Sequence, residues 1–172
     1  SAVSRGLGDV YKRQVLKAPA HTPEMAALYE VYPDARFIHL HRDTYDVVAA
    51  GAHLFAVFQS TYSDTVDSEA VGVYQLDTLC TWFERACSAR DVIPEAQCLD
   101  VHFSELVCDP LSCVERILRW LDLGDGPMEP VRSYLASAGH DARYAYTGEQ
   151  FGLTKGAVNE RLAEYRARFE VG

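Results

Sequence analysis

Three side chains that could bind or act on an anionic group stand at the ends of two predicted strands in this 172-residue chain. Lys17 and His21 flank the APA of the stretch LKAPAH, and Arg42 follows the strand FIHLH and leads directly into a predicted helix. Ligands of parallel sheets bind where a strand ends and the next helix begins, because the first N–H groups of that helix are free. A guanidinium at such a place suits a phosphate or sulfate group, although Arg42 could instead simply pair with Asp43 or Asp46.

Alternating strands and helices must position these side chains. Apolar runs predict short strands at residues 15–18, 34–41 and 98–103. The order of strand, helix, strand, helix implies parallel strands that are joined by crossover helices. Start signals and apolar residues at helical spacing predict helices over residues 22–32, 43–60, roughly 72–90, 110–121, 131–138 and 154–169. Gly72 is expected to weaken the first turns of the third helix.

The N-terminal segment carries two glycines but no nucleotide-binding fingerprint. Gly6 and Gly8 fit neither a Walker loop, which needs a glycine followed by Lys and Ser or Thr, nor the three spaced glycines of a dinucleotide site. Residues 4–14, SRGLGDVYKRQ, instead resemble the translation of a transposase adapter that is used to prepare DNA sequencing libraries. We therefore interpret residues 1–14 as a non-native segment outside the sheet and residues 15–172 as a partial domain.

Charge and cysteine content exclude several classes of function. The net charge of −9 argues against broad electrostatic binding to nucleic acid, heparin or an anionic membrane, and no apolar run is long enough for a membrane span. The five cysteines include no CxxC pair, so they indicate neither a zinc site nor a disulfide framework. Unpaired cysteines favour a reducing compartment, and we expect a cytoplasmic protein.

Two histidines invite a metal hypothesis. His39 and His41 point to the same face of the strand FIHLH, as two metal ligands could. The sequence shows no third ligand at a recognisable spacing, so we expect no metal site.

Four blocks occur in an order that resembles the bacterial-type sulfotransferases, which use 3′-phosphoadenosine 5′-phosphosulfate (PAPS). They are VLKAPAH, YPDARFIHLHRDTYDVVAAG, VHFSELVCDPLSCVERILRWLDL and YAYTGEQFGLTKGAVNERLAEYRARF. The resemblance implies an α/β fold of the P-loop-NTPase-like, three-layer αβα type with a mostly parallel sheet. It also implies that the first strand and the loop for the 5′-phosphosulfate are missing, so we expect this C-terminal part to be inactive by itself.

The same resemblance assigns the nucleotide contacts. Arg42 matches the family arginine that binds the 3′-phosphate, and Phe103 stands where the family has a tyrosine that packs against the purine. Arg143 is a weaker candidate for a second phosphate contact. Two positions depart from the family: Thr44 replaces a proline, and Ala50 replaces a phosphate-binding serine. The missing hydroxyl predicts weaker binding of the 3′-phosphate, or help from another group.

Sulfuryl transfer needs a base for the acceptor proton and cations for the developing negative charge. His21 is the expected base, and Lys17 is expected to donate to the sulfonate or the bridging oxygen. The acceptor is expected to be a hydroxyl (or amine) on a small alcohol, a lipid-like molecule or a glycoside. Residues 58–68 are where we expect acceptor contacts.

Two alternatives remain open from the residues. Lys17 and Arg42 could serve a P-loop-type small-molecule kinase, although no magnesium-binding aspartate of the Walker B kind follows the strand. The chain could also be a noncatalytic interaction domain that kept the fold and lost the site, as Ala50 would suggest.

Overall fold

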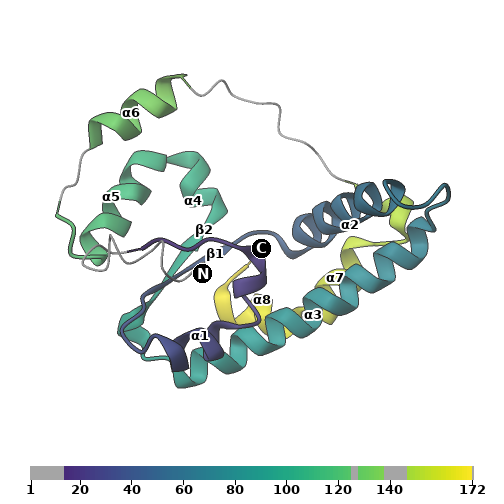
Figure 1. Ribbon diagram of the computed structural model, residues 1–172, viewed down its shortest axis with the longest axis horizontal. Coiled ribbons are helices and arrows are strands. Elements are labelled where there is room, and N and C mark those ends of the chain that lie inside the picture. The colour runs from purple at the N-terminus through teal and green to yellow at the C-terminus, as the bar shows by residue number, and fades with distance from the viewer. Residues whose placement is uncertain (1–13, 125–127, 138–146, 172) are drawn as a thin grey trace, which may run out of the picture.

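The computed structural model describes residues 14–124, 128–137 and 147–171 and places two parallel strands between helices (Figure 1). The strands are β1 (Phe37–His41) and β2 (Cys98–His102). The helices and 3₁₀ turns are η3 (Pro19–His21), α1 (Met25–Val31), α2 (Thr44–Ser60), α3 (Ser68–Val92), η4 (Glu95–Gln97), α4 (Phe103–Cys108), α5 (Pro110–Trp120), α6 (Met128–Ser137), η5 (Glu149–Phe151), α7 (Lys155–Arg161) and α8 (Ala163–Phe169). The expected α/β class with a parallel sheet is confirmed.

The register of the two strands sets the position of the site. Phe37 pairs with Cys98 and His41 with His102, so both strands end at the same edge. The crossover between them consists of α2 and α3, as parallel pairing requires. Figure 1 shows α4 and α5 on one side of the strands and α3 and α8 on the other. The helices therefore form layers on both faces of this small sheet.

The main hydrophobic core lies between α2, α3 and the C-terminal helices. The alternating burial of β1 turns His39 and His41 toward this side, where Phe169 of α8 covers them. The largest members of the core are Val48, Val71, Leu76, Leu79, Phe83, Phe151, Leu153, Val158, Leu162, Tyr165, Phe169 and Val171. None of the described helices combines the length and the apolar composition that crossing a membrane requires.

Several helix boundaries agree with their sequence signals. Asp109 caps α5 by accepting from the Ser112 N–H at 3.0 Å, and Pro110 begins that helix. Thr154 caps α7 in the same way. The single helix expected over 154–169 is wrong, because the buried Leu162 leaves helical geometry (φ −107°, ψ 20°) and divides it into α7 and α8.

The strand expected at residues 15–18 is also wrong. This segment belongs to no strand, and its Val15 is 90% exposed. A strand needs a neighbour for its N–H and C=O groups, but within the described part of the chain β1 pairs only with β2. The expectation that residues 4–14 lie outside the sheet falls almost entirely on residues 1–13, which are outside the described ranges.

Gly72 lies inside α3 without interrupting it. A Cβ at this position would collide with the backbone carbonyl of Phe151, which crosses the helix there. The weakness expected from the glycine is thus offset by close packing of η5 against α3.

Candidate functional site

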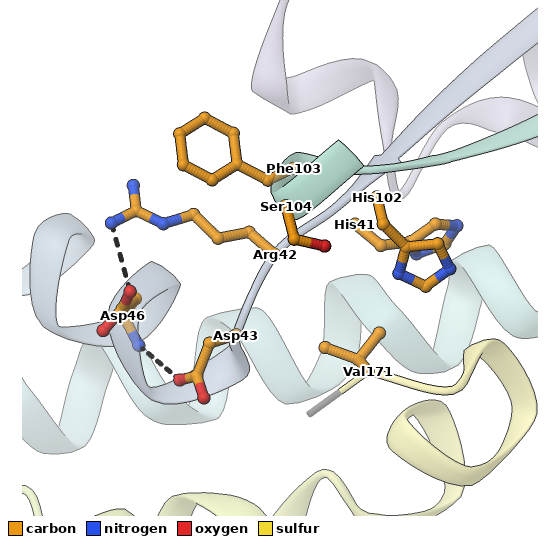
Figure 2. Close-up of a pocket in the computed structure, with 8 residues that line it drawn as sticks. All are labelled: His41, Arg42, Asp43, Asp46, His102, Phe103, Ser104 and Val171. Atoms are coloured by element: carbon orange, nitrogen blue, oxygen red, sulfur yellow. Dashed lines mark hydrogen bonds and ion pairs between the residues drawn. The ribbon is translucent and has the colours of Figure 1, made fainter. Parts of the chain in front are cut away.

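The candidate site lies where the two parallel strands end. His41 and His102 are register partners, and the residues that follow them, Arg42 and Phe103, lie against each other. The guanidinium carbon of Arg42 is 5.0 Å from the centre of the Phe103 ring. Figure 2 shows the two side chains next to each other at the pocket. An arginine over an aromatic face is held by cation–π attraction, which limits where its remaining donors can point.

A pocket of about 260 Å³ opens beside this pair. It is placed at the carboxyl ends of the strands, where ligands of open parallel sheets bind. The lining residues come from β1, the start of α2, the end of β2, the start of α4 and the C-terminus: His41, Arg42, Asp43, Asp46, His102, Phe103, Ser104 and Val171. The structure therefore brings together two of the expected nucleotide-binding residues, Arg42 and Phe103.

One nitrogen of the Arg42 guanidinium is paired, and another has no partner among the described residues. Its Nη2 donates to Asp46 Oδ2 at 3.2 Å, so the pairing weighed as the alternative from sequence does occur. Its Nε is buried and has no partner among the described residues. A buried donor without an acceptor costs free energy. Arg42 also lines the pocket, so an anion bound there would bring acceptor oxygens to its guanidinium. The guanidinium can thus bind an anion while it stays paired with Asp46.

The start of α2 offers less to an anion than the sequence suggested. Asp43 caps this helix by accepting from the Asp46 N–H at 3.1 Å, and Lys155 Nζ lies 3.1 Å from the other carboxylate oxygen. The cap occupies one of the N–H groups expected to be free. Arg42 therefore carries the main positive charge of the pocket, against the carboxylates of Asp43 and Asp46.

A buried polar network holds the strand just before Arg42. His41 is 1% exposed, and its ring nitrogens contact Tyr165 Oη at 2.7 Å and Asp100 Oδ1 at 2.9 Å. Arg90 donates to both oxygens of Asp100, at 2.5 and 3.0 Å. Burial would raise the pKa of Asp100, but the hydrogen bonds from His41 and Arg90 outweigh it and hold that pKa well below its usual range. Burial raises the pKa of Tyr165, which stays a neutral phenol.

The structure places a possible third metal ligand, Asp100, beside His39 and His41. The sequence spacing did not reveal this ligand. Asp100 is the register partner of His39, and one ligand atom each from His39, His41 and Asp100 lie within 4.8 Å of one another. The Arg90 guanidinium occupies both oxygens of that carboxylate, and His41 already has partners at both nitrogens. A cation would have to displace these bonds next to an arginine, so we keep the expectation of no metal site.

The expected catalytic residues lie apart from this pocket. Lys17 stands on the exposed segment before η3, and His21 is the half-buried last residue of η3. Neither lines the pocket around Arg42. Arg143 lies outside the described residues, and the segment expected to contact the acceptor includes Tyr62, which is 93% exposed.

Sequence reasoning missed Ser104 and Asp46 as pocket residues. Ser104 brings a hydroxyl to the pocket that contains Arg42, and Ala50, where the family serine was expected, is not among the lining residues. Aligning the ends of the two predicted strands, residues 41 and 103, would have placed Ser104 beside Arg42, because the carboxyl ends of parallel strands meet at the same edge of a sheet.

Comparison with known proteins decides the family. The sequence model described as "Sulfotransferase family" matches residues 3–126, which is most of the chain. The chain belongs to this sulfotransferase family. Its expected fold class is confirmed by two solved sulfotransferases, STF9 from Mycobacterium avium (28% identical, TM-score 0.79) and STF1 from Mycobacterium tuberculosis H37Rv (31% identical, TM-score 0.76). The chain superimposes over 91% and 92% of its own length, on 42% and 41% of theirs.

A curated relative has a named substrate. The omega-hydroxy-beta-dihydromenaquinone-9 sulfotransferase Stf3 of Mycobacterium bovis is 28% identical over 133 residues, and the protein of the same name from Mycobacterium tuberculosis matches equally well. The alignment covers 73% of this sulfotransferase-family chain and 33% of each relative. The chain thus spans about a third of the length of the curated relatives it matches.

Proposed function

We propose that this chain provides the 3′-phosphate-binding part of an active site that transfers a sulfuryl group from PAPS to a hydroxyl acceptor. The observation that carries the proposal is the Arg42 guanidinium, which lines the pocket at the strand ends and has a buried Nε without a partner among the described residues. The proposal is supported by membership of the sulfotransferase family. It goes beyond family membership because it names the 3′-phosphate as the group that Arg42 binds.

Arg42 and Phe103 recognise different parts of the nucleotide: Arg42 binds by charge, and Phe103 binds by stacking. Arg42 supplies a charge-assisted hydrogen bond to a 3′-phosphate oxygen, the strongest kind of contact available to a guanidinium. Phe103 is 37% exposed and can pack a purine edge or face against its ring. Ser104 adds a hydroxyl donor in the same pocket, which offsets the serine that Ala50 replaces.

The chemical step needs groups that lie outside this pocket. His21 takes the proton of the acceptor hydroxyl as its oxygen attacks sulfur, and Lys17 donates to the sulfonate or to the bridging oxygen. The bond between sulfur and the bridging oxygen breaks, and adenosine 3′,5′-bisphosphate leaves. Both residues come from the segment before β1.

The acceptor is a hydroxyl on a small or lipid-like molecule. The proposal is supported by the curated relative, whose name specifies an omega-hydroxy menaquinone derivative. The acidic net charge of −9 disfavours polyanionic glycans at long range. A cytoplasmic location belongs to the same proposal.

Binding of adenosine 3′,5′-bisphosphate to the purified chain tests the nucleotide part by titration calorimetry. Adenosine 5′-monophosphate, which lacks only the 3′-phosphate, is the matched control ligand, and ATP tests the kinase alternative. We expect the bisphosphate to bind at least tenfold more tightly than either, as one charge-assisted contact predicts. Equal affinity for all three would overturn the proposal, and preference for ATP would favour a kinase.

A further inference from the structure

The side chains on both sides of Arg42 contact the C-terminal part of the chain, while Arg42 itself has no hydrogen bond to that part among the described residues. Each neighbouring residue has a partner in residues 148–166: His41 contacts Tyr165 Oη at 2.7 Å, Asp43 contacts Lys155 Nζ at 3.1 Å, Thr44 contacts Asn159 and Arg166, and Tyr45 Oη accepts from the Gly148 N–H at 2.8 Å. Within the described ranges, the side chain of Arg42 contacts Asp46 and Phe103. Its position therefore depends on how firmly its neighbours are held.

Thr44 is the most constrained of these neighbours. It is 0% exposed, it is the first residue of α2, and its Oγ1 donates to Asn159 Oδ1 at 3.2 Å. Arg166 Nη1 donates to Thr44 Oγ1 at 3.1 Å and to Asn159 Oδ1 at 2.9 Å. A single guanidinium group thus binds both members of the Thr44–Asn159 pair.

The position of Thr44 explains why such a network is useful. The first position of a helix is the one that best accommodates proline, whose ring fixes φ near −65° without any partner. Threonine has no such ring. The Thr44 side chain is instead held by tertiary contacts, the hydrogen bonds of its Oγ1 with Asn159 and Arg166.

We propose that Arg166 is a positioning residue for nucleotide binding: through Thr44 and Asn159 it fixes the backbone that presents Arg42 to the 3′-phosphate. The inference rests on the proposed function, because it names the residue that orients the phosphate-binding arginine. Arg166 acts across the boundary between the C-terminal helices and the strand end, far from Arg42 in sequence. It does not line the pocket.

Replacement of Arg166 by methionine removes the donors and keeps much of the length of the side chain. We expect Arg166→Met to weaken binding of adenosine 3′,5′-bisphosphate by about three- to tenfold, as loss of one or two hydrogen bonds predicts. Arg168→Met is the matched control on the same helix, since Arg168 donates to Cys87 O and Asp91 on α3 instead. The control should lower thermal stability to a similar degree and leave the affinity unchanged.

A rescue variant separates positioning from general stability. Thr44→Pro in the Arg166→Met background should restore the affinity to within about twofold, because proline fixes the same torsion covalently. Asp43 already has a ψ of 125°, which suits a residue before proline. A merely structural arginine would not be rescued in this way, so failure of the rescue would overturn the inference.

Hydrogen exchange provides a readout that needs no nucleotide. The amides of Asp46 and Val47 bond to Asp43 at the start of α2. They should exchange about three- to tenfold faster in Arg166→Met and at the original rate in Arg168→Met. If Arg42→Ala weakens binding but Arg166→Met changes neither affinity nor exchange, this inference fails alone. If Arg166→Met speeds exchange but Arg42→Ala leaves binding intact, the proposed function fails.

Discussion

The guanidinium of Arg42 lies over the ring of Phe103, 5.0 Å from its centre, although the two residues are far apart in sequence. They meet because each immediately follows one of two paired parallel strands that end in register. In the proposed function, this contact joins the cation that binds the 3′-phosphate to the ring that packs against the purine. Substitution of either residue should therefore change the affinity for the nucleotide.

Arg42→Ala tests the cation directly. The variant should lose affinity for adenosine 3′,5′-bisphosphate by about 1.5 to 3 kcal/mol, the range of a charge-assisted hydrogen bond. Affinity for adenosine 5′-monophosphate should change little in the same calorimetric titrations. An unchanged affinity for the bisphosphate would mean that Arg42 serves only its pair with Asp46.

Ala50→Ser restores the hydroxyl that the sequence resemblance implies at this position. Residue 50 follows Asp46 by one helical turn on α2, so its side chain lies on the same helix face as Asp46. We expect the variant to bind adenosine 3′,5′-bisphosphate a few-fold more tightly, by about 0.5 to 1 kcal/mol for one added hydrogen bond. Ala56→Ser, on the same helix but away from the pocket, is a suitable control. Equal effects of the two variants would show that this helix face does not meet the phosphate.

His21→Ala should separate chemistry from binding. In a form of the protein with sulfotransferase activity, the variant should lose sulfuryl transfer to its acceptor and keep its affinity for adenosine 3′,5′-bisphosphate. The reason is that a general base contacts the acceptor proton and not the nucleotide. Turnover is measured with a sulfonate-transfer assay, and a variant that retains full kcat would remove His21 from the mechanism.

His39 should make the stability of the fold depend on pH. Burial, reinforced by the neighbouring His41, lowers the pKa of His39 to about 3, while the unfolded chain keeps the ordinary value near 6.5. The unfolded state therefore binds more protons below pH 6.5, so the free energy of unfolding should fall as the pH falls. One such group contributes a slope of up to about 1.4 kcal/mol per pH unit.

Urea denaturation between pH 7 and pH 5 measures this slope. His39→Leu should flatten it, because leucine fills a similar volume and has no proton to bind. The variant should also be no less stable than the original chain at pH 5, since His39 Nδ1 is buried without a partner among the described residues. An identical slope in both proteins would show that His39 is not the group responsible.

Local signals in the sequence predicted the elements that depend on the nearest residues. The Asp109–Pro110 start of α5 and the Thr154 cap of α7 depend on hydrogen bonds that span three residues, so the sequence contains them directly. Arg42 was placed at a strand end for the same reason, because the change from alternation to helical spacing occurs there. The expected strand at residues 15–18 failed because strand formation depends on a neighbour and not on local composition.

Tertiary structure decided which distant residues share the site. The sequence alone determined that Arg42 ends a strand and that His39 and His41 share one face. Only the pairing of β1 with β2 set Phe103 against Arg42 and Asp100 beside both histidines. Only the packing of α7 and α8 brought Asn159 and Arg166 to Thr44. Strand register and helix packing arise from burial of apolar surface between elements distant along the chain, and no local pattern of residue types encodes that geometry.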